Sequence, residues 1–117
     1  MGARIIGTGS AVPTTCLTND DIAKRVDTSD KWIVTRTGIE ERRVITQGES
    51  VLDLIHEASL KALESSGLSP DKLDAILVAT VSGEYAFPST ACLLQARLGV
   101  DSVPAFDIAA ACAGFVY

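Results

Sequence analysis

The alternation of apolar runs with helical patterns along the chain predicts a layered α/β fold with a largely parallel or mixed sheet. Three apolar runs indicate strands, at residues 4–8, 74–81 and 103–108. The second run is continuously apolar, which is typical of a central strand covered on both faces. Residues 39–45 alternate imperfectly around a charged centre, so they predict an exposed edge strand or an extended arm.

Four predicted helices lie between these segments, and each begins near a capping residue. They are expected at residues 19–26, 31–37, 51–66 and 89–98. Glycines follow the last three of them, as is typical of a helix that ends at a C′ glycine. The third helix is expected to bury one apolar stripe, formed by Val51, Leu54, Ile55, Ala58 and Ala62.

Gly7 and Gly9 follow the first predicted strand, and a G-x-G sequence in that place suggests dinucleotide binding. The third glycine of that fingerprint would fall at position 12, which is Val12. No acidic residue closes a second strand at the expected distance either. The sequence therefore favours a turn in which these glycines serve the backbone.

Charge and cysteine content exclude several classes of protein. The 117 residues carry a net charge of −5 and contain no basic run, which argues against a nucleic-acid partner. No apolar stretch is long enough to span a membrane, so we expect a cytoplasmic protein without a membrane partner. Cys16, Cys92 and Cys112 form no C-x-x-C pair and predict free thiols, with neither a disulfide framework nor a metal site.

Trp32 and Arg36 stand four residues apart on a predicted helix and therefore share one face. An indole beside a guanidinium suits a flat anionic ligand, because the ring stacks on an aromatic base and the arginine meets a phosphate. The alternative is a cation–π pair that serves packing alone. The residues by themselves leave both interpretations open.

The last predicted strand leads into Cys112, which is surrounded by small residues. Small neighbours permit a tight turn into a helix that starts at Cys112, and its first N–H groups would lower the thiol pKa and hold an oxyanion. Cys112 is thus a candidate nucleophile for acyl transfer, and a buried cysteine in an alanine-rich turn is the structural alternative. The only histidine, His56, follows the apolar stripe of the third helix, so we expect a surface or boundary position rather than a catalytic base.

Residues 28–39, 86–89 and 105–117 have the sequences TSDKWIVTRTGI, AFPS and AFDIAAACAGFVY. These motifs resemble the bacterial β-ketoacyl-acyl carrier protein synthase III family, the initiating condensing enzymes of type II fatty acid synthesis within the thiolase-like superfamily. The resemblance implies one domain over residues 1–117. This domain would be the amino-terminal half of a thiolase-like fold, a layered α-β-α arrangement with a mixed sheet, that stops after the start of the nucleophile helix.

The resemblance also implies the chemistry. Cys112 matches the nucleophile that takes an acetyl or other short acyl group from acyl-CoA. Malonyl-acyl carrier protein then loses CO2 and attacks the thioester to give a 3-ketoacyl product. Trp32, Arg36 and Thr28 match residues that hold CoA, and Phe87 matches a residue that reaches the partner's acyl pocket in a homodimer. No cofactor is implied, since acyl-CoA is a substrate.

Members of this family are more than twice as long as this chain, and their second half supplies a histidine and an asparagine that work with the cysteine. We therefore expect an amino-terminal piece of a longer enzyme, found together with a carboxy-terminal part. One alternative is a short protein that serves as an inactive remnant or interaction module. Others are a related quinolone or polyketide starter synthase, and an acyl-CoA-binding or dimerisation fragment without turnover.

Overall fold

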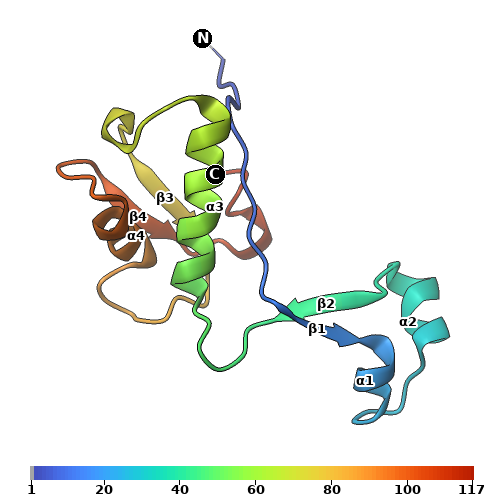
Figure 1. Ribbon diagram of the computed structural model, residues 1–117. Coiled ribbons are helices and arrows are strands. Elements are labelled where there is room, and N and C mark those ends of the chain that lie inside the picture. Colours follow the sequence, from blue (N-terminus) through green and yellow to red (C-terminus); the bar gives the residue numbers. More distant parts are fainter. Residues whose placement is uncertain (1) are drawn as a thin grey trace. The chain divides into compact units, whose positions relative to one another are not determined.

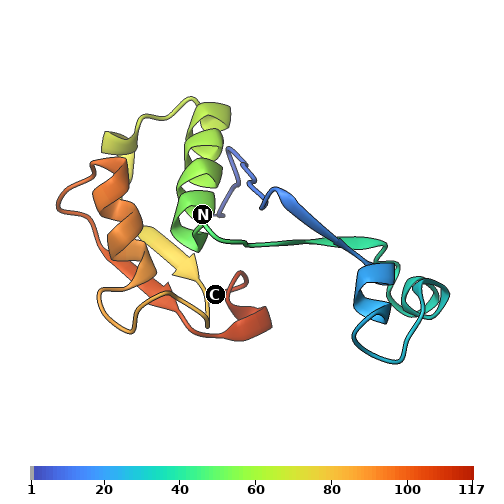
Figure 2. The same cartoon turned by 60° about the horizontal axis from the view of Figure 1, so that its bottom comes forward.

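The computed structural model describes residues 2–117, which form two compact units. One unit joins Met1–Ala11 to Val51–Tyr117, and the other is Val12–Ser50. Figures 1 and 2 show the elements of each unit. Among residues 2–117, no helix combines the length and hydropathy that a membrane crossing requires.

The first unit contains a two-stranded parallel sheet. Strand β3 (Ile76–Ala79) pairs with β4 (Ala105–Ile108) in a register that aligns the first residues of the two strands and also their last residues. Parallel strands need a crossover connection, and α4 (Thr90–Leu98) supplies it. The parallel pair agrees with the predicted largely parallel or mixed sheet, and both predicted strands are confirmed, although each strand is shorter than its apolar run.

Two helices cover this sheet. Helix α3 (Val51–Ser66) packs against α4, and α4 contacts both strands (Figure 1). The 3₁₀ turn η1 (Pro70–Lys72) connects α3 to β3. Ser89 caps α4 by accepting a hydrogen bond from the N–H of Cys92, and Gly99 ends the helix in the left-handed conformation. These capping and terminating residues are the ones that the sequence predicts.

The core of this unit lies where α3, β3 and α4 meet. Its buried members are Leu52, Ile76, Ala91 and Leu94. Leu52 lies outside the apolar stripe predicted for α3, so the stripe was wrong at that position. The reason is that α3 has two neighbours: Leu52 and Ile55 pack in the core, whereas Ala58 and Ala62 lie against an irregular amino-terminal segment.

Residues 4–8 form no strand, which corrects the prediction made from their apolar character. The segment instead runs along α3, where Gly7 and Gly9 bring its backbone against the helix backbone. A Cβ atom on Gly9 would lie 2.5 Å from the Ala62 nitrogen, and one on Gly7 would lie 2.7 Å from the Ser66 Cβ. The two glycines are thus explained by close approach to a helix, in agreement with a backbone role rather than dinucleotide binding.

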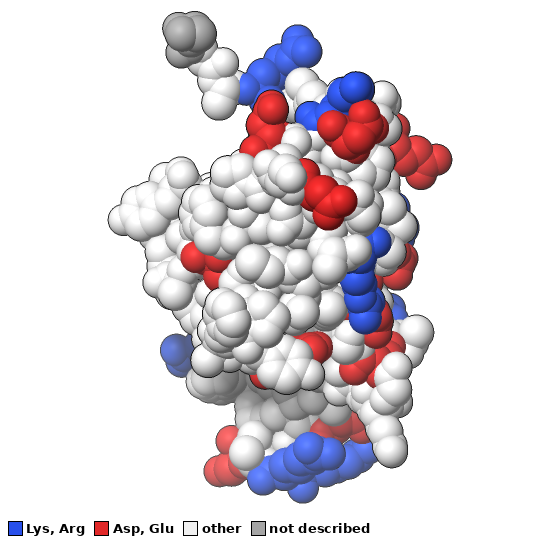
Figure 3. All heavy atoms as spheres, turned by 90° about the vertical axis from the view of Figure 1, so that its left-hand side faces the viewer, with Lys and Arg blue, Asp and Glu red and all other residues white. Residues whose placement is uncertain are grey.

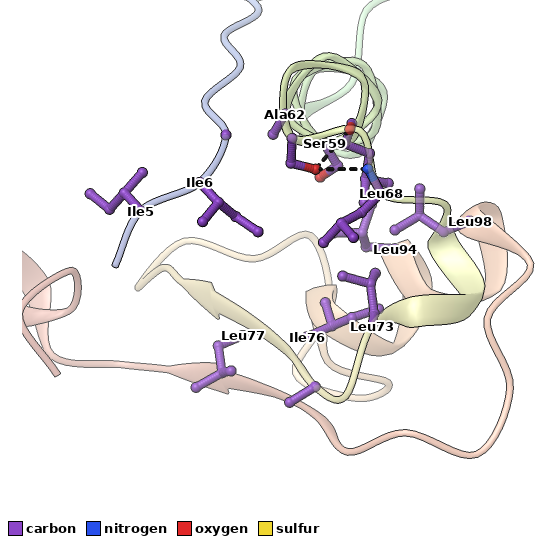
Figure 4. A pocket seen from close by; sticks show the side chains of 14 residues that line it. Ile5, Ile6, Ser59, Ala62, Leu68, Leu73, Ile76, Leu77, Leu94 and Leu98 are labelled. Atoms are coloured by element: carbon purple, nitrogen blue, oxygen red, sulfur yellow. Dashed lines mark hydrogen bonds between the residues drawn. The ribbon is translucent and has the colours of Figure 1, made fainter. Parts of the chain in front are cut away.

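A cavity of about 420 Å³ lies between this segment, α3, β3 and α4. Figure 4 shows Ile6, Leu77 and Leu94 among the apolar side chains around it. None of the predicted site residues lines the cavity.

The sheet is covered on one face only within residues 2–117, which corrects the expectation that β3 is covered on both faces. Leu77 and Phe106 are register partners, and they are 51% and 48% exposed. Phe87, Phe115 and Tyr117 are also exposed apolar side chains of this unit. Side chains other than Lys, Arg, Asp and Glu cover much of the face drawn in Figure 3. A continuous apolar run does not reveal whether the second face has a cover.

The second unit is an antiparallel pair of strands with two helices. Strand β1 (Thr15–Thr18) pairs with β2 (Glu41–Val44), which confirms a strand within residues 39–45. Helices α1 (Asn19–Ala23) and α2 (Asp30–Thr37) connect them. Strand β1 was not predicted, and α1 ends three residues before the expected end at Val26.

Two polar side chains hold the second unit together. Buried Asn19 donates from Nδ2 to Asp30 Oδ1 and to the Ile39 carbonyl oxygen, at 2.8 Å each, so it joins the start of α1 to both ends of the α2 region. The Glu49 carboxylate accepts hydrogen bonds from the N–H and hydroxyl groups of both Thr14 and Thr46, at 2.9–3.1 Å. These bonds hold the pKa of Glu49 down at about 2.

We expect Gly9→Ala to lower the free energy of unfolding by about 1–3 kcal/mol, because the added methyl group meets the backbone of α3 and neither backbone can yield cheaply. Thermal or urea unfolding measures the effect. Gly2→Ala is the matched control, since a Cβ atom there has nothing within 4 Å. Equal stability of the two variants would contradict the close contact.

We expect Glu49→Gln to destabilise the second unit at neutral pH, because the amide replaces one accepting oxygen with a donor. The pKa of Glu49 is lowered from 4.5 to about 2, so its contribution is complete above pH 4.5 and is lost as the pH falls to about 2. The difference in urea midpoint between wild type and variant should therefore shrink across that range. Glu40→Gln, a matched control at an exposed position, should keep the wild-type urea midpoint at neutral pH.

Candidate active site

Cys112 lies in a tight turn that follows β4. The turn η2 (Ala111–Ala113) is a 3₁₀ helix in which the N–H groups of Ala113 and Gly114 donate to the carbonyls of Ala110 and Ala111, both at 3.0 Å. The tight turn is confirmed, but the α-helix expected to start at Cys112 is wrong, because these bonds span three residues rather than four. These two N–H groups are engaged in the turn itself, so they are not the free oxyanion donors that the sequence suggested.

The chain reverses direction immediately before the cysteine. Ala111 has a φ of 44°, in the left-handed region, which costs a residue with a Cβ atom about 1–2 kcal/mol. Alanine is the smallest such residue, so the small neighbours of Cys112 have a structural purpose. The result is an exposed thiol at the carboxyl end of a parallel strand, which is where open α/β sheets bind ligands.

The other two thiols differ from Cys112 in exposure and environment. Cys92 is partly buried in α4, with its Sγ 3.4 Å from the Ala105 carbonyl oxygen. Cys16 is partly buried in β1, where a hydrogen bond to the Glu41 carboxylate raises the pKa of the thiol above 9.0. All three thiols are free, as predicted, and Cys112 is the exposed one.

Asp107 fixes the elements that carry the site, and sequence reasoning missed it. It lies in β4, and its carboxylate accepts hydrogen bonds from the N–H groups of Thr90 and Ala91, both at 2.8 Å. These bonds bind the first turn of α4 to the strand that leads to Cys112. A carboxylate between Phe106 and Ile108 in an apolar run is the signal that could have revealed it.

Phe87 and His56 lie in the same unit as Cys112. Phe87 belongs to the loop between β3 and α4, and its side chain is 89% exposed. It precedes Pro88 through a cis peptide bond. His56 is partly buried on α3, which confirms the predicted boundary position.

The second unit brings the three predicted CoA-binding residues together. A pocket of about 720 Å³ is lined by Thr28 and Trp32, with apolar neighbours such as Ile22 and Ile33. The Arg36 guanidinium carbon lies 5.2 Å from the centroid of the Trp32 ring, so the predicted cation–π contact is present. The pocket lies open beside the half-exposed Trp32 ring. A cation–π pair that served packing alone would not require such a pocket.

The start of α2 determines where Trp32 is held. Ser29 caps this helix, and its hydroxyl accepts a hydrogen bond from the N–H of Trp32 at 3.2 Å. Trp32 therefore lies in the first turn and Arg36 one turn later, on the same face. Gly38 ends the helix with a φ of 71°.

Within residues 2–117, no group of three or more His, Cys, Asp or Glu side chains could hold a metal ion.

Comparison with known proteins finds relatives that are similar over the whole chain. The chain is 54% identical over 117 residues to the beta-ketoacyl-[acyl-carrier-protein] synthase III of Psychromonas ingrahamii. The chain is also 52% identical over 115 residues to the protein of the same name from Laribacter hongkongensis. The crystal structure of 3-oxoacyl-[acyl-carrier-protein] synthase III from Aquifex aeolicus superposes on 99% of the chain, with a TM-score of 0.93 and 52% identity. No model of a known protein family matches the chain.

The predicted thiolase-like α/β fold is confirmed by these structural relatives. The chain covers 37% of the Psychromonas synthase III and 37% of the Aquifex structure, so it spans about a third of the length of such relatives. The priming beta-ketosynthase of the R1128 polyketide biosynthetic pathway is also similar, with a TM-score of 0.90 and 35% identity over 96% of the chain.

Proposed function

We propose that this protein is an acyltransferase that initiates type II fatty acid synthesis, with Cys112 as its nucleophile. The Cys112 thiolate attacks the carbonyl carbon of acetyl-CoA or another short acyl-CoA. A carbon–sulfur bond forms at Cys112, the bond to the CoA sulfur breaks, and CoA leaves as a thiolate that takes a proton. The acyl group is then held on the protein as a thioester.

The second half of the proposed reaction is a decarboxylative Claisen condensation. Malonyl-acyl carrier protein loses CO2, and the electron pair of the broken bond becomes a carbanion that attacks the Cys112 thioester. The product is a 3-ketoacyl-acyl carrier protein, and the Cys112 thiolate is regenerated. Decarboxylation needs donors that stabilise the developing charge, and the family supplies them as a histidine and an asparagine outside the residues that this chain contains.

The observation that carries the proposal is the exposed thiol of Cys112 in the turn at the carboxyl end of β4. Its support from the second unit is a pocket lined by Thr28 and Trp32, with the Arg36 guanidinium beside the Trp32 ring. The adenine would stack on Trp32, Arg36 would meet a phosphate, and Thr28 would contact CoA in the pocket. This assignment rests on the residue-by-residue resemblance to the family, on the pocket that Thr28 and Trp32 line, and on the contact between Trp32 and Arg36.

The proposal extends to the assembly and its location. A homodimer in which Phe87 enters the partner's acyl pocket accords with the exposure of that side chain. A cytoplasmic location accords with three free thiols. A polyketide priming synthase is the second candidate, because the same cysteine chemistry serves a different acceptor; the lower identity of 35% to such an enzyme places it behind the fatty acid initiator.

We expect the natively expressed protein to gain one acyl group at Cys112 when it is incubated with acetyl-CoA. Intact-mass and peptide mass spectrometry locate the adduct, and Cys112→Ala should abolish it. Cys16→Ala and Cys92→Ala are matched controls that should keep it, because neither thiol is exposed like that of Cys112. An adduct that persists in Cys112→Ala would overturn the assignment of the nucleophile.

We expect Trp32→Ala to raise the Kd for CoA about tenfold, since a base stacked on an aromatic ring contributes about 1–3 kcal/mol. Isothermal titration calorimetry measures the change. Trp32→Phe keeps a ring at the same helical position and should lose less affinity. Unchanged binding in Trp32→Ala would show that the cation–π pair serves packing and that CoA binds elsewhere.

A further inference from the structure

Gly114 makes a contact that its neighbours in sequence do not explain. It is buried, and a Cβ atom at this position would lie 2.8 Å from the Cβ of Ala79, 3.3 Å from the Ala111 carbonyl oxygen and 3.6 Å from the Ala79 Cα. Real Cβ atoms do not approach other atoms so closely, so the backbone of Gly114 lies where only a residue without a side chain fits. Ala79 is the last residue of β3.

The backbone conformation does not itself require glycine at this position. Gly114 has φ −56° and ψ −42°, which is right-handed helical geometry open to every residue with a side chain. This differs from Gly38 and Gly99, which end helices with positive φ. The reason for glycine at position 114 is therefore the contact with Ala79 and not a special dihedral angle.

The contact bears directly on the nucleophile. The N–H of Gly114 donates to the Ala111 carbonyl at 3.0 Å, so Gly114 closes the turn that contains Cys112. On the other side of the turn, Ile108 ends β4 and is paired in register with the same Ala79. The end of β3 thus touches the chain both before and after Cys112.

We propose that Gly114 is a positioning residue for the nucleophile: its contact with Ala79 seats the Cys112 turn on the end of β3 and so fixes the direction of the thiol. The role of Gly114 in positioning a nucleophile rests on the proposed acyl transfer at Cys112. The contact between Gly114 and Ala79 does not depend on that proposal. A methyl group at position 114 meets a side chain on a hydrogen-bonded strand. The turn yields more easily than the strand does, so it moves outward and carries Cys112 with it.

The test is the rate at which iodoacetamide alkylates Cys112 in the natively expressed protein, followed by peptide mass spectrometry. Gly114→Ala should raise this rate severalfold, because the turn moves outward and the thiol becomes more accessible to the reagent. The second substitution Ala79→Gly removes the closest of the atoms that the new methyl group meets. The double variant should therefore react within about threefold of Ala79→Gly alone.

The alkylation rate of Cys92 separates positioning from general loss of structure. Unfolding would speed the alkylation of partly buried Cys92, whereas displacement of the turn should leave the Cys92 rate unchanged. If Gly114→Ala does not fold, Ala79→Val tests the same contact from the strand side, where a β-branched residue suits the backbone, and should also raise the rate at Cys112. An unchanged Cys112 rate in both variants, or a gain that Ala79→Gly does not relieve, would overturn the proposal.

Iodoacetamide needs no acyl-CoA site, so the two proposals can fail separately. Faster alkylation in Gly114→Ala together with no acetyl adduct on the wild type would retain the positioning role of Gly114 and reject the acyl transfer. Acetylation of wild-type Cys112 with no change in Gly114→Ala would retain the acyl transfer and reject the positioning role.

Discussion

The parallel pairing of β3 with β4 is the constraint on which the nucleophile depends. Because parallel strands point the same way, the connections that follow them leave from one edge of the sheet. The loop with Phe87 follows β3, and the turn with Cys112 follows β4. Asp107 then binds the start of the crossover helix to β4, so the helix and the turn share one fixed strand. The paired strands, the crossover helix and Asp107 together fix the position of the exposed Cys112 thiol.

The pocket with Trp32 depends on different interactions, all within its own unit. Ser29 caps α2, and buried Asn19 joins the start of α1 to Asp30 and Ile39. Glu49 closes the ends of the unit through four hydrogen bonds. Most of the second unit is short helix and short strand, so polar side chains with fixed partners do what a large apolar core does elsewhere. Each of the two candidate sites is therefore held by interactions within its own unit.

The sequence predicts those parts of the fold whose causes are local. Ser29 and Ser89 cap helices, and Gly38 and Gly99 end them, because a cap or a terminating glycine acts on residues within one turn. The strand expected at residues 4–8 was wrong and β1 was missed, because a strand exists only with a partner that the local pattern does not identify. Cys112 and the Trp32–Arg36 pair could also be predicted, because the sequence pattern that indicates each of them spans only a few residues.

The remaining determinants are contacts between segments far apart in the chain. Asp107 acts on residues 16 and 17 positions before it, and Gly114 meets a strand 35 positions before it. A glycine that ends a helix and a glycine that packs closely against another segment cannot be told apart in a sequence. The two kinds respond differently to substitution by a residue with a side chain. The first kind resists any side chain because of its own backbone angle. The second kind accepts a side chain once the neighbouring residue is made smaller. The packing of the turn that contains Cys112 therefore depends on Gly114 and Ala79 together, so substitutions at these two positions are not expected to act independently.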